Sequence, residues 1–278
     1  MKFTKMHGLG NDYVYVNAIE QEIVDRPALA RFISNRNFAV GSDGLICIDN
    51  SEIADFKMDM YNADGSSSGM CGNGMRCVGK FVYDKGLTNE TTITVESGGQ
   101  IKVLELFVEQ GVVTSVRVDM GKPILEPKQI PIRSDLETYV NQQIEVDDKN
   151  YFITGVSMGN PHVITFVDDL DIDLACIGPK FEHHPLFPER TNTEFVQVID
   201  ENTLMMRVWE RGSGETLTCG TGACATLVAA VLNGHTKERA TVKLLGGDLD
   251  IFWDRENTGH VFMTGPAVSV FEGELLER

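Results

Sequence analysis

The chain has 278 residues, of which 42% are hydrophobic, which is enough for one large domain or two of ordinary size. Its net charge of −17 argues against binding to nucleic acid or to an anionic membrane surface. No apolar stretch approaches the roughly 20 residues that span a bilayer, and the N-terminus lacks the apolar centre of a signal peptide. We therefore expect a cytoplasmic protein with no membrane partner, in which the six cysteines are reduced.

In the first half of the chain, β-branched and aromatic runs predict short strands around two helices. Strands are predicted at 12–19, 45–48, 56–61, 91–96, 101–108 and 112–119. Helices are predicted at 27–36, where Pro27 follows Asp25, and from 73 to 85, where Gly86 supplies a stop. Residues 62–69 have the composition of a loop.

After a segment punctuated by Gly121, Pro123, Pro127 and Pro131, the same plan restarts. Strands are predicted at 151–157, 162–167, 195–199, 203–209, 239–245, 249–253 and 260–263. Residues 210–218 form a polar loop, and the run 222–233 is apolar on every face, which is typical of a buried helix.

The two halves carry the same punctuation at a constant spacing. Cys71-Gly72-Asn73-Gly74 precedes the helix of the first half, and Cys219-Gly220-Thr221-Gly222 precedes that of the second, 148 residues later. The helix stops and the following Gly-Gly turns match at the same offset, and Asn11 matches Asn160 at 149. We interpret the chain as a duplication. The domains are predicted at 1–121, joined by 266–278 crossing back to add a strand, and at 122–265, with a site in the cleft between them.

A cysteine directly before a glycine-rich helix start has a chemical meaning. Free N–H groups and the helix dipole stabilise a thiolate there, and the same groups can bind a substrate carboxylate. Two such cysteines at equivalent positions indicate that both Cys71 and Cys219 are functional. Cys47 and Cys176 have no counterpart and are interpreted as buried filler, whereas Cys77 and Cys224 lie inside the helices and are interpreted as core.

Three other interpretations of the cysteine and glycine pattern were weighed. Residues 220–225 match a dinucleotide-binding glycine pattern, but a polar loop precedes them where that fingerprint needs an apolar strand. A zinc site of Cys71, Cys77, Cys219 and Cys224 would need unusual spacings, with members inside helices. A two-cysteine redox site would lack an electron-transfer partner. We therefore expect no metal and no cofactor.

Polar residues occupy other repeated positions. Asn62 falls on Glu210, Arg211 follows Glu210, and Asn192 lies 149 residues after Asp43. Side chains of these types hold the ammonium and carboxylate ends of an amino acid. His162 is either a core histidine or a group that tunes a nearby thiol, and the sequence leaves both open.

Two cysteines facing one small substrate suit the inversion of a stereocentre. A thiolate on one side removes a proton, and a thiol on the other side returns one to the opposite face. The helix N-termini would stabilise charge that develops on the carboxylate. The alternatives from another class are a non-catalytic amino-acid-binding protein and a dithiol redox protein.

At these residues the chain resembles the diaminopimelate epimerase family along essentially its whole length. The matching segments are 5–12, 62–66, 71–77, 158–162 and 210–225. The resemblance implies an α/β fold of two pseudo-symmetric domains, each a curved, mostly antiparallel sheet wrapped around a central helix. It also implies interconversion of LL- and meso-diaminopimelate without pyridoxal phosphate or metal, on the route to lysine and peptidoglycan.

The resemblance assigns roles to individual residues. Cys71 and Cys219 would be the acid/base pair, with His162 and Glu210 modulating them. The substrate would be held by Asn11, Asn62, Asn160, Asn192, Glu210 and Arg211, and by the backbone at Gly72, Asn73, Gly220 and Thr221. Many family members carry Gln where this chain has Gly44. Relatives that act on proline or hydroxyproline usually carry His at the position of Asn73, which favours diaminopimelate over another amino acid. The sequence does not decide whether the protein forms a homodimer.

Overall fold

The computed structural model describes residues 1–69 and 71–276. The chain forms two compact units, Met1–Asp119 together with Thr264–Arg278, and Met120–Met263. Each boundary lies two residues before the expected one. Met70, directly before the first cysteine motif, and residues 277–278 of the expected returning tail lie outside the described residues.

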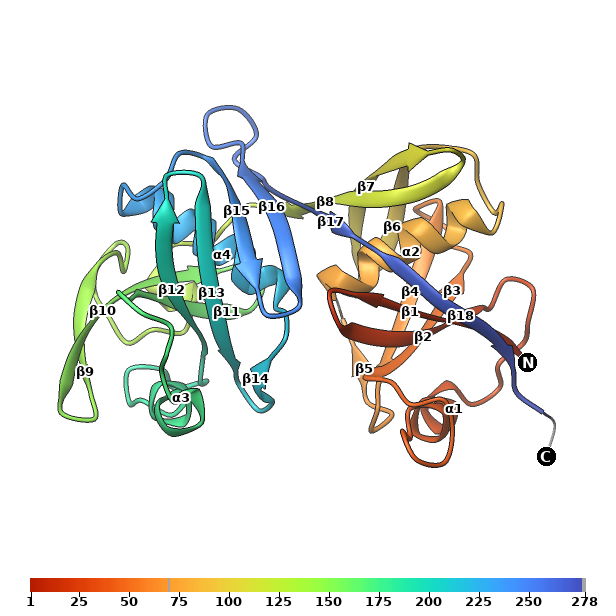
Figure 1. Ribbon diagram of the computed structural model, residues 1–278, viewed down its shortest axis with the longest axis horizontal. Helices are drawn as coiled ribbons and strands as arrows, with labels where there is room; N and C mark the ends of the chain where they lie inside the picture. The colour runs from red at the N-terminus through yellow and green to blue at the C-terminus, as the bar shows by residue number, and fades with distance from the viewer. Residues whose placement is uncertain (70, 277–278) are drawn as a thin grey trace. The chain divides into compact units, whose positions relative to one another are not determined.

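The first unit is a sheet built around one long helix (Figure 1). Its strands are β1 Lys2–Gly8, β2 Asn11–Asn17, β3 Gly44–Asp49, β4 Phe56–Asn62, β5 Ser67–Ser68, β6 Thr92–Ser97, β7 Gln100–Glu109, β8 Val112–Gly121 and β18 Val268–Glu274. Neighbours pair in the order β18, β1, β2, β3, β4, β6, β7 and β8, with β5 beside β4. The β2·β3 and β4·β6 pairs are parallel, and β18 pairs antiparallel with β1, so the predicted strand from the tail is present.

The second unit repeats this plan. Its strands are β9 Gln142–Val146, β10 Lys149–Ser157, β11 Pro161–Phe166, β12 Asn192–Asp200, β13 Thr203–Glu210, β14 Gly214–Thr216, β15 Arg239–Leu244, β16 Gly247–Trp253 and β17 Val261–Pro266. A short 3₁₀ helix spans Pro127–Gln129. The β11·β12 and β13·β15 pairs are parallel, and the β10·β11, β12·β13, β13·β14 and β15·β16 pairs are antiparallel.

The order of parallel and antiparallel pairs is therefore the same in both units, with β1 to β7 corresponding to β10 to β16. The longest helix of each unit also occupies the same place, α2 (Gly72–Asp84) after β5 and α4 (Gly220–Leu232) after β14. The predicted fold class is confirmed: each unit is a mixed, mostly antiparallel sheet around a central helix.

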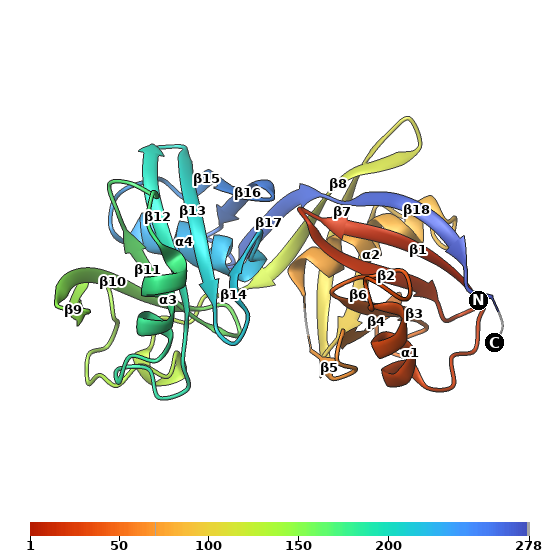
Figure 2. The same cartoon turned by 60° about the horizontal axis from the view of Figure 1, so that its bottom comes forward.

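Two helices cover opposite faces of the sheet in the first unit, α1 (Arg26–Ile33) and α2 (Figure 2). Val14 and Val16 of β2 pack with Ala30 and Ile33 of α1. The alternate residue Tyr15 stacks on Phe81 of α2. Because both faces are covered, β2 reads as a continuous buried run and not as an alternating pattern.

The second unit has the same layering. In α3 (Leu174–Glu182), Phe181 packs edge-on against Phe195 of β12. Residues of β11 and β12 with the opposite parity, among them His162 and Glu194, face α4. This layering places polar side chains of β11 and β12 under the first turn of α4.

Most predicted elements are present with shifted ends, and some were missed. The prediction lacked β1, β9 and α3, and the loops at 62–69 and 210–218 contain β5 and β14. Pro179 inside α3 obscured that helix, because proline normally ends a helix interior. Cys47 is buried as predicted, whereas the prediction for Cys176 is wrong, since this residue of α3 is exposed.

Gly44 is held in a place where the backbone approaches closely. A Cβ atom there would lie 2.1 Å from the Tyr61 carbonyl oxygen on the neighbouring strand β4. We expect Gly44→Ala to lower the free energy of unfolding by about 1–3 kcal/mol, because the strand must shift. Urea denaturation measures the change. Gly69→Ala is the matched control, because its nearest contact would be 4.0 Å away, and an equal loss in both variants would contradict this explanation.

Candidate active site

Cys71 is the N-cap residue of α2, and its sulfur occupies the place of a capping oxygen. Its Sγ accepts a hydrogen bond from Gly74 N at 3.3 Å, and the thiol donates to Asn11 Oδ1 at 3.2 Å. Cys71 is partly exposed. The helix start and the end of the β1–β2 turn thus hold this sulfur from two sides.

Asn11 is fixed by a charged cluster behind it. Its Nδ2 donates to Asp43 Oδ2 at 2.9 Å, and Arg36 bridges Asp43 and Asp12 at 2.9 and 2.8 Å. Lys5 forms a further ion pair with Asp12. Because the amide nitrogen of Asn11 is committed to Asp43, its oxygen is left to face the Cys71 thiol.

Apolar and aromatic side chains also lie near Cys71 and the start of α2. Ile46 of β3 lies under the helix start, since a Cβ at Gly74 would be 2.9 Å from its Cδ1. Burial, followed by the neighbouring Cys71 sulfur, raises the pKa of Tyr13 well above its usual value, so its phenol is neutral. Tyr15 donates to the Gly74 carbonyl at 3.3 Å.

Cys219 caps α4 in the same manner but lies deeper. Its Sγ accepts from Gly222 N at 3.4 Å and lies 3.5 Å from Thr221 Oγ1. Cys219 is 5% exposed. The equivalent cysteines therefore differ in their access to water.

Two carboxylates lie beside Cys219. Burial raises the pKa of Glu210, although a hydrogen bond from the Thr216 hydroxyl acts in the opposite direction. Burial, followed by the charges of Glu210 and Glu194, raises the pKa of Cys219. The expectation that the helix start lowers the thiol pKa is therefore wrong for Cys219, because burial and two acids outweigh the donors at its sulfur. In this conformation the residue is a thiol.

A hydrogen-bonded chain leads from Glu194 to the same sulfur. His162 Nδ1 lies 2.7 Å from Glu194 Oε1, and its Nε2 lies 3.1 Å from Asn160 Oδ1. Asn160 Nδ2 donates to Thr221 Oγ1 at 3.2 Å. Both His162 and Glu194 are fully buried. His162 is thus a buried histidine with a partner at each ring nitrogen, and it also lies close to Cys219.

The other predicted site residues are placed less directly. Asn192 donates to the Pro161 carbonyl at 2.9 Å and accepts from Arg211 N at 2.9 Å, so it joins the ends of two strands. Arg211 donates to the Glu189 carbonyl. Asn62 bonds to Ser66 within its own turn. Asn73 follows Gly72 in the first turn of α2 and is buried, as Gly220 is in α4.

Strand register corrects one correspondence between the halves. Tyr13 pairs with Gly44 in the first unit, and His162 pairs with Asn192 in the second. Asn192 therefore corresponds to Gly44 and not to Asp43. The residue that sequence reasoning missed is Glu194, which lies where the first unit has Ile46. An acid two residues after Asn192, directly before the strand predicted at 195–199, was the signal that could have revealed it.

One cluster of metal-binding side chains occurs here. Ligand atoms of His162, Glu194 and Cys219 lie within 4.8 Å of one another. However, His162 Nδ1 and Glu194 Oε1 are 2.7 Å apart and bonded to each other, whereas two ligands on tetrahedral zinc would be about 3.4 Å apart. The arrangement fits a hydrogen-bonded pair better than a metal site.

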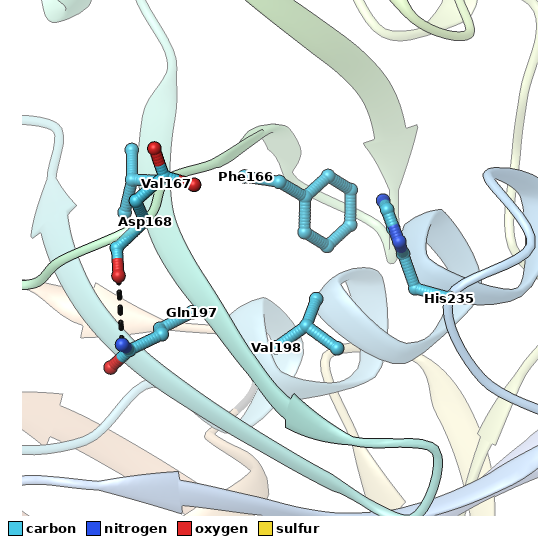
Figure 3. A pocket seen from close by; sticks show the side chains of 6 residues that line it. All are labelled: Phe166, Val167, Asp168, Gln197, Val198 and His235. Carbon is cyan, nitrogen blue, oxygen red and sulfur yellow. Dashed lines mark hydrogen bonds between the residues drawn. The ribbon is translucent and has the colours of Figure 1, made fainter.

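A separate hollow lies in the second unit (Figure 3). Phe166, Val167, Asp168, Gln197, Val198 and His235 line it. The His235 ring packs against Phe166, and Gln197 donates to the Asp168 carbonyl at 2.8 Å. None of the predicted site residues lines this hollow. Within the described residues, no helix is both long and apolar enough to cross a membrane.

The fold is shared with several proteins of known structure. A phenazine biosynthesis protein of Bacillus anthracis aligns over 100% of this chain and 99% of its own, with a TM-score of 0.72 and 17% identity. A probable proline racemase of Agrobacterium radiobacter aligns over 99% and 92%, with a TM-score of 0.71 and 13% identity. A hydroxyproline epimerase of Agrobacterium vitis aligns over 99% of this chain and 90% of its own, with a TM-score of 0.68 and 12% identity. Identities this low define the class of fold alone.

Sequence comparison then identifies the family. The family model described as diaminopimelate epimerase matches residues 3–126 and 154–270. The diaminopimelate epimerase of Acetivibrio thermocellus is 60% identical over 99% of this chain and 98% of its own. That of Methanococcus maripaludis is 57% identical over 99% of each. The chain belongs to the diaminopimelate epimerase family.

The carboxylate of Glu210 makes a testable difference to Cys219. We expect Glu210→Gln to lower the pKa of Cys219, because a negative charge beside the sulfur is removed. The pH dependence of alkylation by iodoacetamide measures this in a Cys71→Ser, Cys176→Ala background. There the other thiols, Cys47, Cys77 and Cys224, have no exposed surface, whereas Cys219 is 5% exposed. Glu201→Gln, in an exposed turn, is the control. If the pKa of Cys219 obtained from the alkylation rates is unchanged or higher in Glu210→Gln, the Glu210 charge does not raise that pKa.

Proposed function

We propose that this protein is an isomerase that interconverts LL- and meso-diaminopimelate by removing and returning a proton at the α-carbon. The observation that carries the proposal is the pair of equivalent helix-capping cysteines, found in a chain that belongs to the diaminopimelate epimerase family. The reaction serves the formation of lysine and peptidoglycan precursors.

In the proposed mechanism Cys71 and Cys219 act on opposite faces of the same carbon. One cysteine, as thiolate, takes the α-hydrogen as a proton, and the electrons of the C–H bond move toward the adjacent carboxylate. The other cysteine, as thiol, gives its proton to the opposite face, which inverts the centre. Each turnover exchanges the protonation states of the two sulfurs, and the reverse reaction restores them. The pair therefore titrates as one coupled unit.

The surroundings of each sulfur support this division of work. Glu210 lies beside Cys219, and its raised pKa makes it a suitable proton acceptor when Cys219 has to become the base. Gly222 N–H and the Thr221 hydroxyl then lie ready to stabilise the thiolate. In the first unit, Asn11 accepts from the Cys71 thiol and holds it in place as the proton donor.

The backbone at both helix starts is proposed to bind the substrate carboxylate. The N–H groups at Gly72–Asn73 and Gly220–Thr221 belong to the first turns of α2 and α4, where negative charge is favoured. Asn62, Asn160, Asn192, Glu210 and Arg211, with Asn11, are proposed to hold the polar ends of the substrate. When the substrate binds, the contacts of Asn62 with Ser66 and of Arg211 with the Glu189 carbonyl would be replaced by contacts with the substrate.

The location and partners of the protein are proposed on chemical grounds. Two working thiols need a reducing compartment, which supports a cytoplasmic enzyme. The net charge of −17 supports the absence of nucleic-acid binding. Light scattering coupled to size exclusion decides between a monomer and the homodimer that the sequence leaves open.

Exchange of the α-hydrogen in deuterated water tests the proposed function. With reduced protein and LL-diaminopimelate, we expect deuterium to enter the α-position as meso product forms. Cys71→Ala and Cys219→Ala are each expected to lower kcat by at least about 10³-fold, since each removes an acid/base group. Mass spectrometry follows the label, and chiral chromatography follows the product.

Cys176→Ala is the control, because this thiol is exposed on α3. We expect it to retain the rate of the unsubstituted protein. Absence of exchange with reduced thiols would overturn the epimerase proposal, and a near-normal rate in either single variant would overturn the two-cysteine mechanism alone.

A further inference from the structure

A carboxylate that the proposed reaction does not use lies buried behind Cys219. Glu194 of β12 has no exposed side-chain surface, and its Oε1 would lie 2.5 Å from a Cβ at Gly222. Within residues 1–69 and 71–276, its Oε2 has no hydrogen-bond partner. Burying a carboxylate costs several kcal/mol unless a partner compensates for the lost water. The partner present is His162, at 2.7 Å.

The directions of the hydrogen bonds around this pair limit how it can be protonated. Asn160 Nδ2 donates to Thr221 Oγ1, so Asn160 Oδ1 faces His162 Nε2 at 3.1 Å. A carbonyl oxygen only accepts, and His162 Nε2 therefore carries a proton. The other ring nitrogen, Nδ1, faces a carboxylate oxygen of Glu194, which also accepts when it is ionised. With Glu194 ionised, Nδ1 has to donate as well, and the pair is an imidazolium next to a carboxylate.

The same directions continue to the sulfur. Thr221 Oγ1 already accepts from Asn160, so its own hydrogen is available to Cys219 Sγ at 3.5 Å. Gly222 N–H is a second donor, at 3.4 Å. Cys71 has a different arrangement, because its thiol donates to Asn11 and Ile46 stands in the place of Glu194.

We propose that Glu194 is a positioning residue that holds His162 as an imidazolium and, through Asn160, aims the Thr221 hydroxyl at Cys219 Sγ. The proposal rests on the epimerase function, since the hydroxyl matters when Cys219 is the thiolate base. The titratable groups that face Glu194 are His162 on β11, Glu210 on β13 and Cys219 at the start of α4. If His162 were neutral, its Nε2 could accept a hydrogen bond. The Asn160 amide could then turn its nitrogen toward His162, and that nitrogen would no longer donate to Thr221.

The first test does not depend on activity. Ring ¹⁵N spectra of the full-length protein are recorded at about pH 8, where an ordinary histidine is neutral, and His162→Asn identifies the signals. We expect both nitrogens of His162 to be protonated in the unsubstituted protein, and one of them in Glu194→Gln, which keeps the shape and removes the charge. A neutral His162 in the unsubstituted protein overturns the proposal, even if Glu194→Gln does not fold.

The second test is kinetic. We expect Glu194→Gln to lower kcat by about 10–100-fold, as substitutions behind a reacting group commonly do, with KM changed less than about threefold. The ratio of variant to unsubstituted kcat should rise as the pH falls from about 8 to about 6, because His162 regains its proton. An equal kcat at pH 8, or a ratio independent of pH, overturns the proposal.

Two further variants separate positioning from a structural effect. Thr193 lies next to Glu194 on the opposite face of β12, and its hydroxyl has no hydrogen-bond partner among the described residues. The Thr193→Val variant should therefore keep the kcat and the His162 spectrum of the unsubstituted protein. The Glu194→Gln, His162→Asn double variant should be no slower than His162→Asn alone, because one residue acts through the other. Additive losses contradict this. If the unsubstituted protein shows no epimerase activity, the proposed function fails, while the spectra still decide the ion pair.

Discussion

The need to cap a buried helix with a sulfur atom governs the rest of the structure. α2 and α4 run inside their units, so the first N–H groups of each helix have little water to bond with. The cysteine sulfur accepts from the N–H three residues on, at Gly74 and at Gly222. Glycine is needed there, because a Cβ would meet Ile46 or Glu194 at 2.9 or 2.5 Å.

This cap creates opposing effects on the thiol. A donor aimed at sulfur favours the thiolate, whereas burial favours the neutral thiol. At Cys219 burial and the adjacent acids prevail, and the pKa rises. An acid/base group that has to hold a proton in one step and release it in another needs such a balance. Glu210, Glu194 and Thr221 are the side chains that act on this balance.

The sequence allowed the repeat, the two cysteines and most strands to be predicted, because their signals are local. Glycine stops, apolar runs and a cysteine at a helix start can be read without knowing the fold. β1 was missed because Lys5, polar in sequence, is buried in the structure through its ion pair with Asp12. α3 was missed because packing overrides Pro179, with Gly178 pressed against Trp209, where a Cβ would lie 2.3 Å away.

The role of Glu194 could not be predicted for a related reason. Its meaning depends on which strand face it occupies and on which residue lies opposite, and both are set by the register between β11 and β12. The offset of 149 that linked Asn192 to Asp43 came from counting residues. Strand pairing shows that Asn192 corresponds to Gly44 instead, and that Glu194 therefore corresponds to Ile46.

The duplication supplies an internal comparison that a single domain would lack. Both units have the same pairing order and the same capped helix, yet Ile46, Tyr13 and Asn62 of the first stand where the second has Glu194, His162 and Glu210. The fold is therefore built equally well without acids or a histidine at these places. Buried ionic groups are weak contributors to stability and are often replaced by apolar side chains without loss. Their presence around Cys219 is best explained by the chemistry of that sulfur, and the differences between the two halves are where the proposed catalytic roles of the two cysteines diverge.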